Sequence, residues 1–227
     1  MAVDEILVLA NSRKWGGRCV AGVSIRDGRW VRPVSDNPHG ALQPRHHRID
    51  GRDVEPLDVV SFEHDGRVDD PSQPENVKVG SSRWWLTGRV ATGEAPKVLS
   101  PHLVDGPVLL GNRGAAMPED DAMKGVDASL ALIRPAQVDF CLEPPSKGTS
   151  KPRPRARFEL DGQQYNLALT DLQLRPRLLA AGLGVHGLDD LGLDPNADVP
   201  LTISLAEARD GWCTKLVAAV LVLPERG

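Results

Sequence analysis

The stretch EILVLANSRKWGGRCVAGVSIRDGRWVRPV, residues 5–34, decides the fold of this chain. It opens with four consecutive apolar residues, Ile6 to Leu9, which is typical of a buried strand. A second apolar run follows at 18–25 and a third at 30–34. Asp27-Gly28 between them is a hairpin signal. The pattern predicts three strands, with residues 11–17 as a polar, basic, glycine-ended turn after the first.

The pattern of the rest of the chain predicts further short strands with turn signals between them. Strands are expected at 57–64, 78–90, 129–133, 138–142, 155–160, 164–169, 201–205 and 214–223. A second hairpin signal, Asp161-Gly162, resembles the first, and 172–181 predicts a short helix despite Pro176. Residues 35–56, 91–127 and 143–155 are expected as long loops, the second with a short helix around Leu103 or Asp120.

The two parts of the chain share an order of elements, although no residue-level repeat connects them. Many short strands and few helices predict a mainly β fold of small sandwiches or barrels. About 100 residues per half suits a five-stranded, partly open barrel. We therefore expect two barrels in tandem with a short helix and long loops, the first over 1–125 with the connecting segment and the second over 126–227.

Composition excludes several classes of protein. The 227 residues are 41% hydrophobic and carry a net charge of −4, which suits a globular chain and argues weakly against one that coats nucleic acid. Three cysteines without short spacing predict a reducing compartment. The N-terminal apolar run is too short for a signal peptide and no window could span a bilayer, so we expect a cytoplasmic protein without membrane contact.

Charge is strongly patterned along the first half. Residues 11–34 are basic and residues 53–75 are acidic. Such a chain can present one basic face while being acidic overall. The two stretches could equally neutralise each other across the fold.

The segment 12–18 is the first candidate ligand site, through Ser12, Arg13, Lys14, Trp15 and Arg18. Its glycines would let the backbone approach a ligand, its cations would contact phosphates and Trp15 would offer a stacking plane. The alternative is a solvated basic turn with Trp15 folded over the core.

Two further candidate groups are expected to bind the same kind of ligand. Trp30 and Arg32 share one face of a strand, where Trp30 could stack a base or could belong to the core. Lys151, Arg153 and Arg155 lie in a proline-stiffened loop that could follow a nucleic-acid backbone or be merely solvated. In the pair Trp84-Trp85, one side chain should be buried and the other exposed or covered.

Enzyme interpretations are weaker. The chain has no nucleophile elbow and no phosphate-binding P-loop, and its six histidines lack metal spacing and are expected to be exposed in loops. Asp171 ends a predicted strand, where catalytic carboxylates often lie, but a helix cap explains it equally well, and the acidic clusters are expected to be solvated loops. We therefore predict no catalytic residue, no metal site and no cofactor.

With these elements in view, the chain resembles the bacterial dual OB-containing domain family. The residues that carry the resemblance are ILVLANSRKWGGRCVAG at 6–22, GRWVRPVS at 28–35, LDVVSF at 57–62, YNLALTD at 165–171 and TKLVAAVLV at 214–222. The resemblance implies two OB-like barrels and a nucleic-acid or nucleotide-binding role, with some relatives implicated in antiviral defence.

The sequence thus favours a non-catalytic binding module for single-stranded nucleic acid or nucleotide. A protein-interaction or assembly subunit, as a homo-oligomer or with another protein and without a nucleic-acid ligand, is the alternative. An enzyme acting on nucleic acid would need carboxylates beside Arg13 and Lys14.

Overall fold

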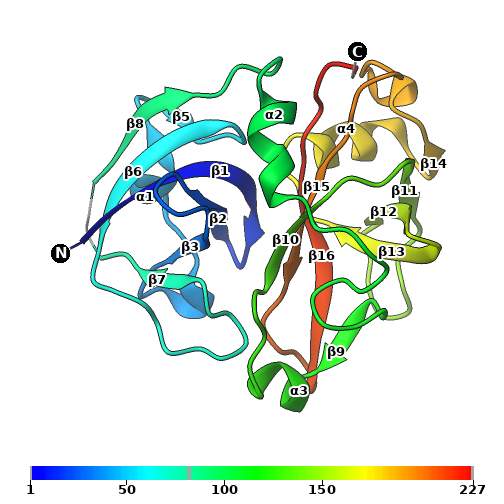
Figure 1. Ribbon diagram of the computed structural model, residues 1–227. Helices are drawn as coiled ribbons and strands as arrows, with labels where there is room; N and C mark the ends of the chain where they lie inside the picture. Colours follow the sequence, from blue (N-terminus) through cyan, green and yellow to red (C-terminus); the bar gives the residue numbers. More distant parts are fainter. Residues whose placement is uncertain (1, 81–82, 226–227) are drawn as a thin grey trace.

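In the computed structural model, which describes residues 2–80 and 83–225, two β-rich halves lie side by side (Figure 1). The first half holds a six-stranded sheet in the order β7-β3-β2-β1-β6-β8. Its strands are β1 (Ala2–Lys14), β2 (Gly17–Ser24), β3 (Trp30–Val34), β6 (Asp58–His64), β7 (Asn76–Lys78) and β8 (Trp84–Arg89). Only the β3–β7 pair is parallel among these neighbours.

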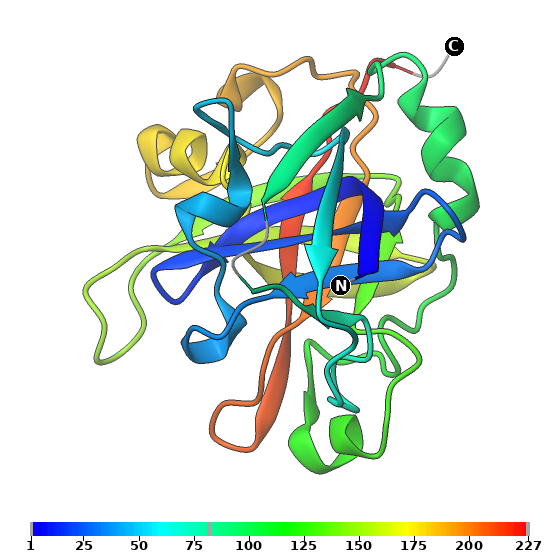
Figure 2. The ribbon, with the colours of Figure 1, turned by 90° about the vertical axis from the view of Figure 1, so that its left-hand side faces the viewer.

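The second half holds a larger sheet in the order β10-β15-β16-β13-β12-β11-β14, with β9 also paired to β16. Its strands are β9 (Ala116–Pro118), β10 (Leu130–Ile133), β11 (Val138–Glu143), β12 (Arg153–Leu160), β13 (Gln163–Leu169), β14 (Gly184–His186), β15 (Leu201–Leu205) and β16 (Trp212–Val220). Figure 2 looks onto the first half, with β15 and β16 in orange and red behind it.

Short helices and a small hairpin complete the fold. They are η1 (Pro38–Gly40), α1 (Pro44–His47), β4 (Arg48–Ile49), β5 (Arg52–Asp53), α2 (Ala95–Leu99), η2 (Ser100–His102), α3 (Glu119–Met123), α4 (Leu174–Ala181) and η3 (Asp189–Leu191). Helix α2 lies over the contact between the two halves (Figure 1). No helix within 2–80 or 83–225 is long and apolar enough to cross a membrane.

The mainly β fold is confirmed, with differences in the sheets. The sheets have six and eight strands rather than five, and within the described residues the end strands of neither sheet pair with each other. Each half is therefore an open, OB-like sheet. The division at residues 125 and 126 stays a prediction: β9 of the connecting segment pairs with β16, while α2 packs on both halves.

Three expectations about local structure were wrong. Residues 11–14 continue β1, so the turn is shortened to Trp15-Gly16. Strand β12 begins at Arg153, inside the predicted proline loop, because its backbone pairs with Glu143 of β11. The histidines were expected to be exposed in loops, but His46 and His47 are buried on α1 and His64 is buried at the end of β6.

Strand β1 is buried on both faces, which explains its continuous apolar run. Side chains alternate across a strand, so Ile6 and Val8 enter the core of the first half, while Leu7 and Leu9 point the other way. There they pack against a set of residues from the second half: Leu130, Leu132, Ala218, Ala219, Leu221 and Leu223. We call this contact between the halves the seam.

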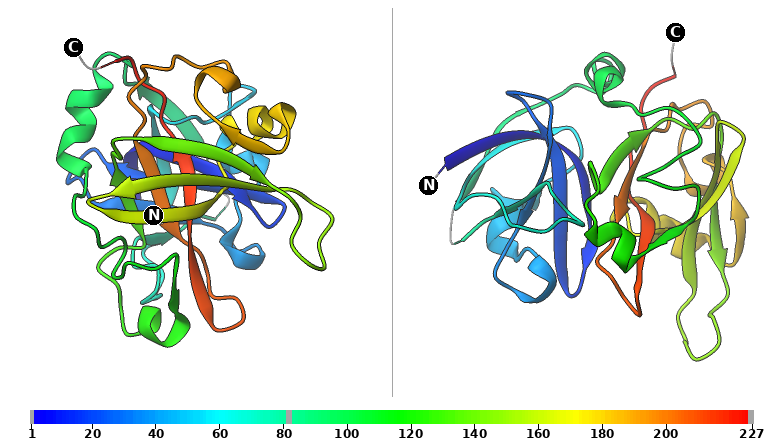
Figure 3. Two further views of the ribbon diagram at one scale, coloured as in Figure 1. Left: turned by 90° about the vertical axis from the view of Figure 1, so that its right-hand side faces the viewer. Right: turned by 60° about the horizontal axis from the view of Figure 1, so that its bottom comes forward.

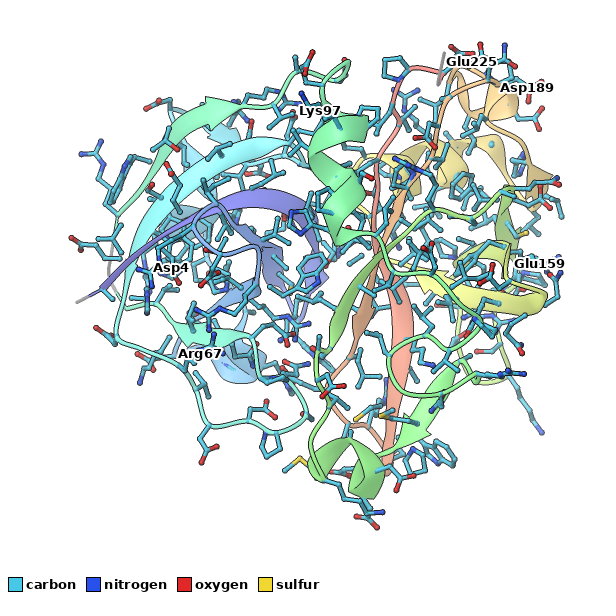
Figure 4. The ribbon with its side chains drawn as sticks, viewed as in Figure 1. Asp4, Arg67, Lys97, Glu159, Asp189 and Glu225 are labelled. Atoms are coloured by element: carbon cyan, nitrogen blue, oxygen red, sulfur yellow. The ribbon has the colours of Figure 1, made fainter. Side chains whose placement is uncertain are left out.

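The seam also carries backbone and side-chain hydrogen bonds. Thr202 Oγ1 donates to the Leu9 carbonyl at 2.7 Å, and the Arg13 amide donates to the Thr170 carbonyl at 3.3 Å. Ser12 and Asp171 form a β-bridge. Figure 4 shows side chains from both sheets filling the space between them, with charged residues such as Asp4, Lys97 and Glu159 at the periphery. The far end of β1 is thus anchored in the second half.

Arg32 of β3 is the polar centre of the seam. Its side chain is 1% exposed and pairs with Glu75 at 2.9 Å. The same guanidinium donates to Ser129 Oγ at 2.9 Å and to Ser204 Oγ at 3.2 Å, both from the second half, and Ser129 donates to Glu75. Because a buried charge needs a partner, this network holds the two halves in one register.

Lys215 of β16 is a second buried cation, 2% exposed, and among residues 2–80 and 83–225 it forms no ion pair with a carboxylate. Its Nζ donates to the carbonyls of Asn112 and Gly114 and to Asn112 Oδ1, at 2.7–2.8 Å. These bonds tie the connecting segment to the second sheet. Burial lowers the pKa of Lys215 to about 8.

Arg32→Met should destabilise the protein by about 3–5 kcal/mol, because it leaves the Glu75 carboxylate buried without its counter-charge. Urea unfolding measures this loss. Arg29→Met is the matched control, since Arg29 pairs with Asp27 at the surface and should change stability little. Equal unfolding free energies for the two variants would show that Arg32 does not hold the seam.

Lys215 should make stability rise with pH. Its pKa is lower in the folded chain than in the unfolded one, so above about pH 8 the unfolded chain keeps a proton that the folded chain releases. The free energy of unfolding should increase by about 2 kcal/mol between about pH 8 and 9.5. Lys215→Met should remove this increase, and an unchanged pH slope in the variant would contradict the assignment.

Candidate functional site

A groove of 530 Å³ opens at the seam beside the end of the β1–β2 hairpin. From the first half it is lined by Ser12, Arg13, Lys14, Trp15, Cys19, Arg32, His39 and Gln73. From the second half it is lined by residues 204–209 together with Thr214 and Leu216. The predicted residues Ser12 to Trp15 therefore come together in one concave surface, and the second half supplies its other wall.

Trp15 occupies a strained position at the tip of that hairpin. Lys14 pairs with Gly17, so Trp15 and Gly16 form a two-residue turn, with φ of 41° and 82°. Positive φ at both central positions is what a type I′ turn requires, and glycine, asparagine and aspartate normally supply it. A bulky residue there stores strain, which is a pointer to function when the side chain is also exposed.

The second half contains a turn of the same conformation, formed by residue types that are usual at these positions. Asp161 and Gly162 join β12 to β13 with φ of 45° and 78°. Aspartate accepts this conformation more readily than tryptophan does. Trp15 is thus the exception within a pair of otherwise equivalent hairpins.

The indole ring of Trp15 is 65% exposed and stacks on His39, with ring centroids 4.4 Å apart and planes inclined by 19°. His39 itself has φ of 61° in the loop after β3. His39 thus supports one face of the exposed Trp15 ring at the rim of the groove. Such a ring can stack a nucleobase.

Glu207 of the second half fixes this arrangement. Its carboxylate accepts from Lys14 Nζ at 2.7 Å and from His39 Nδ1 at 2.8 Å. One acid thus holds both the strand end and the ring under Trp15. The charge of Lys14 is largely neutralised, which leaves Arg13 as the exposed cation of the hairpin at this groove.

The turn approaches the loop before α1 so closely that only glycine fits at position 17. A Cβ on Gly17 would lie 2.5 Å from the Leu42 carbonyl oxygen. Arg18 forms a bridge to Leu42 at that point, with backbone hydrogen bonds in both directions. The glycine therefore serves packing of the hairpin rather than approach to a ligand.

Arg32 and Trp30 do not present a ligand-binding face. Arg32 touches the groove only from beneath, because its guanidinium is buried in the ion pair with Glu75. Trp30 is half-buried and packs on the seam core with Leu7 and Val23. Of the two alternatives for Trp30, its place fits the core, and the prediction that Arg32 binds a ligand from an exposed strand face is corrected by its burial.

Arg18 faces away from the groove. It lines two shallower depressions on the other side of the turn and lies 3.6 Å from Asp53.

The basic residues of the β11–β12 hairpin lie elsewhere. The loop of this hairpin projects from the second half in both views of Figure 3, and none of Lys151, Arg153 and Arg155 lines the groove. Glu143 pairs with Arg153 at 3.0 Å, and Arg155 is half-buried against Asn166. Burial lowers the pKa of Arg155. Arg153 and Arg155 thus form contacts within the second sheet, whereas Lys151 is exposed.

Residues that sequence reasoning missed are His39, Glu207 and Arg209, which complete the groove. None follows a motif, and each comes from an irregular segment whose position depends on the seam. Within the described ranges, no group of three or more His, Cys, Asp or Glu side chains is placed to hold a metal ion.

Comparison with known proteins identifies one family. The family model described as "Dual OB-containing domain" matches residues 4–220, nearly the whole chain. A search of curated proteins finds no match.

Trp15→Asn should be at least as stable as the wild type, because asparagine relieves the strain at positive φ by about 1 kcal/mol or more while the stacking on His39 is lost. Trp15→Ala loses the stacking but keeps the unfavourable φ, and should be about 1 kcal/mol less stable than Trp15→Asn. Urea unfolding compares the variants.

The second hairpin provides the control. Asp161→Trp places tryptophan in the same turn without a His39 to stack on, and it should be destabilising. If Trp15→Asn is clearly less stable than the wild type, the turn at Trp15 stores no strain.

Proposed function

The chain belongs to the dual OB-containing domain family, and from this premise and the seam groove we propose that it binds single-stranded nucleic acid or a nucleotide without catalysing a reaction. OB folds in general bind nucleic acids or proteins. In oligonucleotide-binding members of this fold, the connection between the first two strands is one of the usual ligand loops. Here that connection is the Trp15–Gly16 turn.

The observation that carries the proposal is the exposed, strained Trp15 stacked on His39. A surface indole on a positive-φ turn costs stability, so a role in stacking is a reason to keep it. Base stacking on an aromatic side chain contributes about 1–3 kcal/mol per base and tolerates any base. The groove beside it has a volume of 530 Å³, which is large enough for a nucleotide-sized ligand.

The charges around the groove support the same ligand. Arg13 is exposed on the hairpin and Arg209 lies on the opposite wall, where its pairing with Asp210 at 3.6 Å is solvent-exposed. Glu207 is already engaged by Lys14 and His39. Arg209 on one wall and Arg13 at the edge of the groove favour a polyanion, and the contacts should weaken with salt.

The groove supports binding better than catalysis. The carboxylate at its rim, Glu207, forms two close contacts with cationic or imidazole groups and has no second acid beside it among the lining residues. As a wider context that rests on family resemblance, we propose that this binding occurs in the bacterial cytoplasm and serves defence against foreign genetic elements.

Trp15→Ala should weaken binding of a labelled single-stranded oligonucleotide of about 12 nucleotides by roughly tenfold or more, through loss of one stacked base. Fluorescence anisotropy at about 50 mM salt measures the dissociation constant. Trp85→Ala is the matched control, since Trp85 is exposed on β8 at the far edge of the first sheet. A mononucleotide in the same assay separates nucleotide from strand binding.

Binding of the wild type should fall steeply as salt rises. An absence of binding to DNA, RNA and nucleotides at low salt would reject the proposal. Equal affinities of Trp15→Ala and the wild type would reject the groove as the site. A stable homo-oligomer or co-purifying protein that depends on Trp15 would favour the protein-interaction alternative.

A further inference from the structure

A second depression, of 490 Å³, lies on the opposite side of the Trp15–Gly16 turn from the groove. Three arginines line it: Arg13 from β1, Arg18 from β2 and Arg175 from α4. Arg13 also lines the groove, so the two concave surfaces meet at this residue. The depression is assembled from both halves, because α4 belongs to the second.

Arg13 and Arg175 are like charges that converge without a counter-charge. Within residues 2–80 and 83–225, neither side chain forms an ion pair or a side-chain hydrogen bond, while most other arginines of the chain do. Arg175 is half-buried, and burial together with the charge of Arg13 lowers its pKa. Two guanidiniums held near each other repel, and the fold does nothing to offset this.

The two acids that line the depression are used elsewhere. Asp53 lies 3.2 Å from His47 and 3.5 Å from Arg48, and reaches Arg18 only at 3.6 Å. Asp171 is buried and accepts backbone N–H groups of Gln173, Leu174 and Val220. Neither carboxylate neutralises Arg13 or Arg175, so the depression keeps an excess of positive charge.

Arg18 adds a third guanidinium to the lining. Its Nη2 lies 3.6 Å from Asp53, and this long ion pair leaves the outer N–H groups able to contact an anion as well. An arginine fork can bind an oxyanion through two parallel N–H groups. Three guanidiniums around one concave surface therefore match the chemistry of a phosphate.

We propose that the Arg13–Arg18–Arg175 pocket holds a phosphate group of the same strand whose base stacks on Trp15. This inference rests on the proposed function, and it adds a residue from the second half, Arg175, to the ligand site. The strand would cross the hairpin tip, with a base on the groove side and a phosphate on the other. Both halves would then be needed for one ligand.

Arg13→Gln and Arg175→Gln should each weaken oligonucleotide binding by roughly threefold at moderate salt. Each should also make the dependence of log K on log salt shallower by about 0.7, the value for one phosphate contact to a single strand. Arg26→Gln removes an equal charge from the exposed β2–β3 hairpin and is the matched control. Its salt slope should stay at that of the wild type.

Inorganic phosphate alone provides an independent readout. In the wild type it should shift the NMR signals of the Arg13 and Arg175 side-chain Nε–H groups, and Arg175→Gln should remove the shift of Arg13. Backbone amide spectra show whether each variant is folded, and Arg175→Lys keeps the charge if the glutamine variant is not.

The outcomes separate the two proposals. If an oligonucleotide binds through Trp15 while both glutamine variants keep the wild-type salt slope, the phosphate pocket is wrong and the proposed function stands. If no oligonucleotide binds but phosphate shifts Arg13 and Arg175, the three arginines form an anion site, and both the proposed function and the assignment of the pocket to a strand phosphate fall. A gain in affinity from a 5′-phosphate that disappears in Arg175→Gln would assign the pocket to a terminal phosphate, and equal affinities would assign it to the internal backbone.

Discussion

The structure depends on one constraint: strand β1 has no solvent-facing side along its apolar run. Ile6 and Val8 fill the core of the first half, and Leu7 and Leu9 fill the seam. Burying four large side chains on two faces removes more apolar area from water than either half could achieve alone with this strand. Because the same strand serves both cores, the halves cannot separate without exposing Leu7, Leu9 and their partners on β10 and β16. The groove lies at the end of this strand, so the packing that fixes β1 also fixes one wall of the groove.

The polar counterpart of this constraint is the network around Arg32. A guanidinium buried between Glu75, Ser129 and Ser204 cannot shift register without losing its partners, so it orients the sheets where hydrophobic contact alone would tolerate sliding. On a strand, an arginine beside a tryptophan suggested a ligand-binding face. What the pattern could not express is that a chain segment more than 90 residues later covers that face and supplies the hydroxyl that Arg32 binds.

Several groups in unfavourable states lie at or near the tip of the β1–β2 hairpin. Trp15 and His39 adopt positive φ, Trp15 is exposed, and Arg13 and Arg175 line one depression without forming an ion pair among the described residues. Local conflicts of this kind persist where the surrounding structure determines them, and they concentrate at binding sites. The second hairpin, with Asp161 and Gly162 in the same turn, shows that the backbone itself does not demand a tryptophan. The cost is therefore specific to the first hairpin, where the two halves meet.

The sequence by itself determined the mainly β fold, most of its strands and the tight turn at Asp161-Gly162, and it singled out Ser12 to Trp15, which line one groove, as candidate ligand residues. It could do so because alternation, apolar runs and glycine turns are local signals. It also determined that one tryptophan of Trp84-Trp85 is buried and the other exposed, since neighbours on a strand face opposite sides. Only the tertiary structure decided that Arg32 is a core ion pair, that Glu207 and His39 complete the groove, and that Arg175 joins Arg13. These pairings connect residues far apart in sequence. Burial and distance decide whether a charged side chain forms a core ion pair or faces a ligand, and a linear pattern contains neither quantity.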